Sequence, residues 1–197
     1  MEVIAKFISI ALVTVFAENS IFARGLGSST MLSAAKNKRE IAGFGISITF
    51  ISTISSALSF FVDKLYVNKA LSYIYMPLIY VLIIGFVYIS TLLCLWKWLP
   101  NLFVKIKRYV HISAFNCAVL GALFINSQNG SSFSSYIGHG FGTGIGFLLA
   151  TYLVSIGYKK LNSDKVPESF RGLPIMLIYI GILSLAFYGM LGYQVAL

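Results

Sequence analysis

Six long apolar stretches dominate the chain, and most polar and charged residues lie between them. Most of the stretches approach the roughly twenty residues that an α-helix needs to cross the hydrocarbon core of a bilayer. The pattern therefore predicts an all-α integral membrane protein with six transmembrane helices. The expected spans are residues 3–23, 41–62, 71–96, 110–126, 134–157 and 173–193.

The first and fourth stretches are each interrupted by polar residues. Glu18 and Asn19 interrupt the first, and a glycine-containing run at 25–27 follows them closely. Asn116 and Cys117 interrupt the fourth. Corresponding breaks in the two halves of a membrane protein point to a site near the bilayer midplane, where an inverted repeat meets itself. Backbone freed by such breaks must line a cavity or be covered by protein, so we expect function to lie here.

The six stretches form a single membrane domain, residues 1–197, with a three-plus-three division into halves at about 1–99 and 100–197. Because each half holds three helices, the second half enters the membrane from the opposite face to the first. We therefore expect two inverted three-helix repeats, with helices 1 and 4 broken near the midplane.

Composition and charge exclude a soluble domain and indicate an orientation. Hydrophobic residues make up 58% of the chain and charged residues 11%, with a mean hydropathy of +0.85. A soluble domain of this length could not bury so much apolar surface. Most of the 15 basic residues lie in the expected loops after helices 1, 3 and 5. The positive-inside rule places those loops in the cytoplasm and both termini outside, and the net charge of +9 needs no nucleic acid to explain it.

Polar groups inside the broken stretches are candidates for an ion path, because such groups are costly in a membrane. Glu18 and Arg24 could form a buried ion pair that fixes the first break, or Glu18 could bind a coupling ion or a proton. Asn19 and Asn116 could satisfy backbone groups freed by the breaks, or they could coordinate a cation through their amide oxygens. Both alternatives are open for each pair.

The fifth stretch is rich in glycine. Small residues at helical spacing let two helices approach closely, and no strand precedes the run as one would in a dinucleotide-binding motif. We expect a packing or interfacial role for His139 within it. The glycines form two adjacent stripes, with Gly138, Gly142 and Gly146 on one face and Gly140 and Gly144 beside it.

Several segments resemble the Rnf/Nqr family of membrane subunits, in register along essentially the whole chain. The run Asn-Cys-Ala-Val-Leu-Gly at 116–121 is similar to the family's motif in the fourth helix. The residues at 18–19 and 25–27 resemble its first broken helix, and the glycine-rich run at 140–144 resembles its fifth. Residues 166–172 and 184–187 resemble the entry into the sixth helix. Within the family, the similarity is greatest to the A-type component of Rnf complexes and the E-type component of sodium-pumping NADH:quinone reductases.

The resemblance implies a subunit of an ion-translocating electron-transport complex in a bacterial inner membrane. Family members pair with a homologous six-helix subunit of opposite orientation, and each of the two offers one Cys from each broken helix to a shared [2Fe–2S] cluster. The cluster passes electrons across the bilayer between ferredoxin- or NADH-side and flavin-bearing subunits, coupled to Na⁺ or H⁺ transport. Cys117 is the matching ligand in the fourth helix. Such a cluster needs four ligands, more than one chain of the pair supplies.

The chain departs from the family pattern at the first break. The second residue after the Leu-Gly pair at 26–27, where the family has Cys, is Ser29. A serine hydroxyl is a harder and far less acidic ligand than a thiolate. Three alternatives are open, namely a cluster held by three Cys and Ser29, a ligand supplied by a partner, and no cluster. Cys94 lies outside both motifs and is expected to be a small buried apolar residue.

The resemblance leaves two functions open. The first is an electron-carrying subunit of an ion-translocating complex, with Cys117 as a cluster ligand. The second is a divergent, cluster-less family member that serves as a transporter-like or scaffolding membrane protein. No zinc-type spacing, phosphate-binding loop or hydrolytic triad is visible, so no catalytic residue is assigned. The first function is favoured, because loss of a cluster should release both Cys positions and only the one at Ser29 has changed.

Overall fold

The computed structural model describes the chain except for residues 1, 66–71, 130–131, 162, 164–165 and 191–197. The described part is helical and contains no strand, which confirms the all-α prediction. The helices are α1 (Glu2–Phe16), α2 (Ser20–Arg24), α3 (Ser28–Ala35), α4 (Lys38–Leu65), α5 (Ser72–Trp98), α6 (Pro100–Ala114), α7 (Cys117–Asn129), α8 (Phe133–Leu161), the 3₁₀ turn η1 (Glu168–Phe170) and α9 (Leu173–Met190).

Three described helices are long and apolar enough to cross a membrane, namely Lys38–Leu65, Tyr75–Trp98 and Phe133–Tyr158. The bent pair of α6 and α7 makes a fourth if it is one broken span. The other two expected spans correspond to the shorter apolar helices Val3–Phe16 and Leu173–Gly189, and the end of the last expected span, 191–193, lies outside the described residues. The count of six crossings and the inverted relation of the halves therefore stay predictions.

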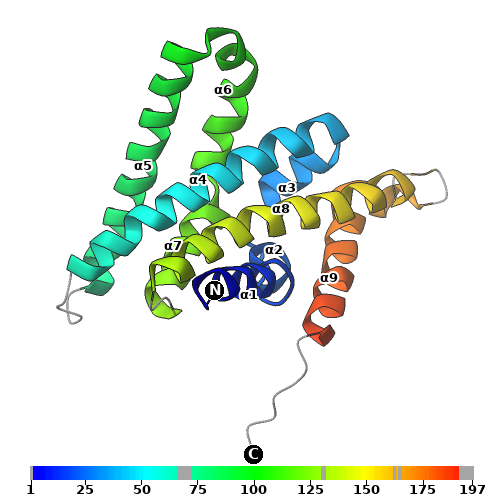
Figure 1. Ribbon diagram of the computed structural model, residues 1–197. Helices are drawn as coiled ribbons and strands as arrows, with labels where there is room; N and C mark the ends of the chain where they lie inside the picture. The colour runs from blue at the N-terminus through cyan, green and yellow to red at the C-terminus, as the bar shows by residue number, and fades with distance from the viewer. Residues whose placement is uncertain (1, 66–71, 130–131, 162, 164–165, 191–197) are drawn as a thin grey trace, which may run out of the picture.

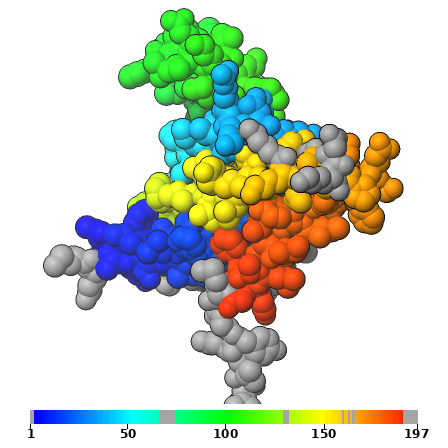
Figure 2. Space-filling model, turned by 90° about the vertical axis from the view of Figure 1, so that its right-hand side faces the viewer, coloured from blue at the N-terminus to red at the C-terminus, as the bar shows by residue number. Residues whose placement is uncertain are grey.

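The long helix α8 organises the molecule (Figure 1). It packs against α4 on one side and α1 on another, while α9 lies near its C-terminal end beside α2. Beyond α4, α5 and α6 stand together as a pair that projects from the rest of the chain, which Figure 2 shows from another side. Of the helices beside the two breaks, α1, α2 and α7 are thus held against α8, whereas α6 is not.

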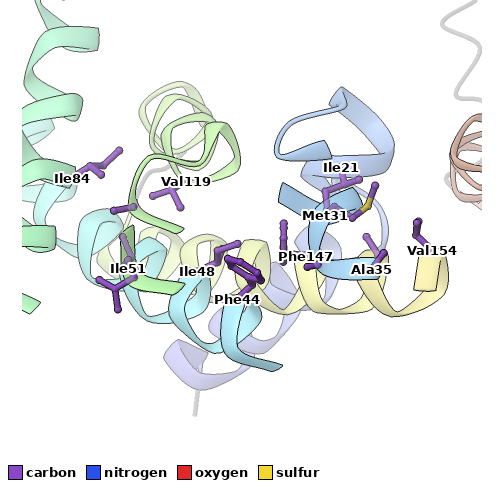
Figure 3. Close-up of a cluster of buried hydrophobic side chains, with 14 of the residues drawn as sticks. Ile21, Met31, Ala35, Phe44, Ile48, Ile51, Ile84, Val119, Phe147 and Val154 are labelled. Carbon is purple, nitrogen blue, oxygen red and sulfur yellow. The ribbon is translucent and has the colours of Figure 1, made fainter. Parts of the chain in front are cut away.

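The buried apolar core runs along α4 and α8 and includes side chains from α2, α3, α5, α6, α7 and α9 (Figure 3). Phe44, Ile48 and Ile51 of α4 share it with Val119 of α7 and Phe147 of α8. In a bilayer, lipid tails are as apolar as these side chains, so close packing rather than removal from water stabilises the contact.

The two glycine stripes of α8 each receive a different helix, and the close approach agrees with the packing role expected from the glycine spacing. A Cβ on Gly142 would lie 2.7 Å from Thr14 Cβ and 2.8 Å from the carbonyl oxygen of Ala11, both on α1. A Cβ on Gly140 would lie 2.6 Å from Ser56 Oγ of α4. The stripes therefore let the backbones of α1 and α4 approach α8 from two sides.

We expect Gly144→Ala to destabilise the protein by about 1–3 kcal/mol, because the added methyl group would collide with the backbone and hydroxyl of Thr49 on α4. The measurement is the unfolding midpoint in an SDS titration of the purified protein in detergent. Gly85→Ala is the matched control, since nothing lies within 4 Å of a Cβ built on Gly85 of α5. Equal losses in the two variants would contradict close packing as the cause.

A polar cluster joins three helices near the C-terminal end of α4. The hydroxyl of Tyr80 on α5 donates to Asp63 Oδ1 at 2.7 Å, and that of Tyr136 on α8 donates to Asp63 Oδ2 at 2.8 Å. Hydrogen bonds to a charged group contribute about 1.5–3 kcal/mol each. The cluster thus fixes the end of α8 from which His139 and the glycine stripes begin.

Candidate functional site

Asn19 forms the first break, between α1 and α2. Its Oδ1 accepts hydrogen bonds from the backbone N–H groups of Ile21 at 3.1 Å and Phe22 at 3.4 Å, which caps α2. Its Nδ2 donates to the carbonyl oxygens of Val15 at 2.9 Å and Gly146 at 3.0 Å. The side chain is 0% exposed. Asn19 therefore satisfies the buried helix end and ties it to α8, which is one of the two roles expected from the sequence.

Two glycines then turn the chain between α2 and α3. Gly25 ends α2 with φ of 69°, and Gly27 begins α3 with φ of 81°. This left-handed backbone conformation is readily adopted only by glycine. The run at 25–27 therefore contains two left-handed residues within three positions, which turn the chain between α2 and α3.

The second break separates α6 from α7, and the two helices are bent by 49°. Asn116 caps α7, as Asn19 caps α2, by accepting a hydrogen bond from the backbone N–H of Ala118 at 2.9 Å. Asn116 is 4% exposed, and its Nδ2 has no hydrogen-bond partner within the described part of the chain. The two amides thus occupy matching positions but differ in how fully they are satisfied.

The two breaks contact each other directly. A Cβ on Gly27 would lie 2.7 Å from Asn116 Oδ1 and 3.2 Å from the Cβ of Ala118. One residue earlier, Leu26 packs against Gly121 of α7. The glycine run of the first break therefore rests on the first turns of α7, as expected for breaks that share one site.

Cys117 and Ser29 both lie exposed beside this junction, in the first turns of α7 and α3. Cys117 lines a cavity of about 140 Å³ together with Asn116 and Ile84 of α5. Ser29 lines a different cavity of about 450 Å³, formed with Tyr158 of α8 and residues of α9. The structure brings the two breaks together but does not place these two side chains in one cavity.

The metal-ligating side chains at the junction are few among the described residues. Cys117 is an exposed free thiol, one residue from the unpaired buried Nδ2 of Asn116. No group of three or more His, Cys, Asp and Glu side chains gathers anywhere among the described residues. A [2Fe–2S] cluster requires four ligands, and Cys117 could supply one of them.

A second polar pair lies at the first break. Glu18 Oε2 is 3.7 Å from Nε2 of His139 on α8. The Glu18 side chain is 40% exposed and lines a cavity of about 450 Å³ between the break and α9. Arg24 lines the same cavity, but the structure shows no ion pair between Arg24 and Glu18 among the residues it describes. The partner of Glu18 is therefore His139, not the arginine considered from the sequence.

The structure corrects the expectation that Cys94 is buried, and it adds a carboxylate neighbour to the packing role expected of His139. Cys94, expected to be buried, is exposed on α5. His139 is 5% exposed, which agrees with a packing role, but it also faces a carboxylate. The sequence signal for this pair was present, since Glu18 and His139 are both ionisable residues within apolar stretches. Nothing in the sequence showed that α8 packs along the first break.

Comparison with known proteins gives a match over nearly the whole chain. A family model described as Rnf-Nqr subunit, membrane protein, matches residues 7–194. The chain is 31% identical over 186 residues to the A component of the Na(+)-translocating ferredoxin:NAD(+) oxidoreductase complex of Acetobacterium woodii, covering 94% of this chain and 96% of that protein. It is 29% identical over 188 residues to the A component of the ion-translocating oxidoreductase complex of Vibrio vulnificus, covering 95% and 97%. A protein of the same description from Tolumonas auensis is 27% identical over 187 residues, covering 95% and 97%.

Proposed function

The chain belongs to the Rnf-Nqr family of membrane subunits, and from this premise we propose that it is a membrane subunit of an ion-translocating oxidoreductase complex. It would help to carry electrons across a bacterial inner membrane, coupled to Na⁺ or H⁺ transport. Relatives that it matches over almost their full length are described as the A component of such complexes. We also propose the orientation inferred from the basic residues, with the loops after the first, third and fifth expected spans cytoplasmic and both termini outside.

The observation that carries this proposal is the exposed thiol of Cys117 at the junction of the two helix breaks. Backbone of irregular conformation at membrane depth must be covered by protein or line a cavity. A protein neighbour would cover the surface of the junction. It would also bring further metal ligands close to the Cys117 thiol.

We infer that the neighbour is a homologous six-helix subunit of opposite orientation, within a complex that also holds flavin-bearing and ferredoxin- or NADH-side subunits. Cys117 would supply a thiolate to a [2Fe–2S] cluster shared with that neighbour, and such a cluster supplies one-electron transfer. Ser29 is the weaker ligand candidate, because its hydroxyl is a hard donor and lines a separate cavity. The remaining ligands would come from the neighbour.

The test is to purify the chain in detergent with its native partners and to measure iron, acid-labile sulfide and the EPR spectrum after reduction. We expect a reducible cluster that is lost in Cys117→Ala, because a thiolate ligand is removed, and retained in Cys94→Ala. Cys94 is the matched control, since it is also an exposed free cysteine but lies on α5, outside both breaks. A cluster that survives Cys117→Ala would overturn the ligand assignment.

The serine at position 29, where the family resemblance implies a cysteine ligand, favours a second function. If the preparation contains partners but no iron, the chain is better described as a cluster-less, transporter-like or scaffolding family member. Its functional cavity would then be the space of about 450 Å³ lined by Glu18 and Asn19 at the first break. Asn116 borders the other break, and its part in an ion path stays a prediction.

A further inference from the structure

We propose that Glu18 and His139 together form a proton-binding site at the first helix break. The site would take a proton, not a metal cation, and would hold it between the carboxylate and the imidazole. Its use in coupled transport rests on the proposed function, but its capacity to bind a proton does not.

The imidazole of His139 is buried without the partners it needs. His139 is 5% exposed, and neither ring nitrogen has a hydrogen-bond partner within the described part of the chain. A neutral imidazole carries one donor and one acceptor, and burying both unpaired is costly. The nearest complementary group is Glu18 Oε2, 3.7 Å from Nε2. A small rotation of the half-exposed Glu18 side chain would turn this separation into a charge-assisted hydrogen bond.

Proton binding balances the charge of the pair. With a neutral imidazole the pair has a charge of −1, from the Glu18 carboxylate. When one proton from water binds, the pair becomes carboxylate and imidazolium, with a net charge of zero. A neutral pair is the less costly form in a membrane interior, because isolated charges are penalised there.

The surroundings favour a proton over a metal cation, because nearby oxygens are already in use. Asn19 Oδ1 accepts two backbone hydrogen bonds, and the hydroxyl of Thr143 donates to the carbonyl oxygen of His139 at 2.9 Å. No third His, Cys, Asp or Glu joins the pair in the described part of the chain. Hard cations need several oxygen ligands, which this site does not offer.

The pair is reached through the cavity between the first break and α9. Glu18 lines that cavity of about 450 Å³, while His139 lies behind it on α8. A proton arriving through the cavity would therefore meet the carboxylate first. Among the described residues, Arg24 of α2 and Tyr188 of α9 line the cavity, and Lys6 lies on α1, next to Phe7, which contacts Gly138. The cluster of Asp63 and Tyr136 begins one turn before His139 on α8.

The test is a pH titration of the full chain in lipid nanodiscs, labelled with ¹⁵N-histidine and with ¹³C at the glutamate carboxyl carbons. The chain contains only two histidines, so His139→Gln assigns the ring signals. We expect the His139 and Glu18 signals to change together. In Glu18→Gln, the pH response of the His139 signal should differ from that of the unchanged chain, because no carboxylate faces the imidazole any longer. By thermodynamic reciprocity, His139→Gln should also change the pH response of the Glu18 signal.

Arg24→Gln is the matched control, because Arg24 lines the same cavity without pairing with Glu18. This variant should leave the coupling between the Glu18 and His139 titrations intact. A His139 signal that titrates independently of Glu18, or does not titrate, would overturn the proposal. Signals that respond to added Na⁺ at constant pH would overturn it in favour of a sodium site. Because no turnover or iron measurement enters, failure here is distinct from failure of the proposed function.

Discussion

Gly27→Ala should destabilise the protein more than any other single-methyl addition at the breaks, by about 2–5 kcal/mol. Two effects combine at this residue. Its φ of 81° costs a residue with a Cβ about 1–2 kcal/mol. The new methyl group would also lie 2.7 Å from Asn116 Oδ1 and 3.2 Å from the Cβ of Ala118, so the Asn116 amide that caps α7 would have to shift. Overpacking of this kind adds about 1–3 kcal/mol.

Gly25→Ala separates these two effects. Gly25 has a similar φ of 69°, but nothing lies within 4 Å of a Cβ built there. This variant should therefore lose only the backbone contribution of about 1–2 kcal/mol. The comparison uses the SDS unfolding midpoint of each purified variant. Equal losses would show that contact between the breaks contributes nothing to stability.

The positions of the two helix breaks were predictable from the sequence. Polar residues and glycines within apolar stretches located both breaks correctly, because Asn19, Asn116 and the run at 25–27 have strong local preferences for caps and turns. The spacing of glycines along α8 likewise predicted close helix packing. These are local signals, read from a few neighbouring residues.

Pairings between distant segments were not predictable in the same way. Periodicity shows that α8 has close-packing faces but not which helix each face receives. The pairing of Glu18 with His139 depends on α1 packing along α8, and the separate cavities of Cys117 and Ser29 depend on how α3 and α7 are turned. Composition also failed for Cys94, because a lipid-exposed helix face accepts a cysteine as readily as a buried one does.

Asn19→Ala should cost about 2–4 kcal/mol, because it removes a helix cap and two further hydrogen bonds from a fully buried position. The lost cap leaves the first N–H groups of α2 unpaired where water does not reach them. The lost donors release the break from Gly146 of α8. The unfolding midpoint in SDS and the retention of helical circular dichroism on heating are the measurements.

Asn116→Ala is the matched variant at the other break, and it should cost less, about 0.5–2 kcal/mol. It also removes a cap, but the Nδ2 that disappears is buried and unpaired, so its loss relieves a desolvation cost that partly offsets the lost hydrogen bond. The two amides occupy matching positions, so an effect of break position alone would destabilise both variants equally. A larger cost for Asn116→Ala would mean that its Nδ2 has a partner in the assembled protein, which would locate a neighbouring subunit or bound group at the junction.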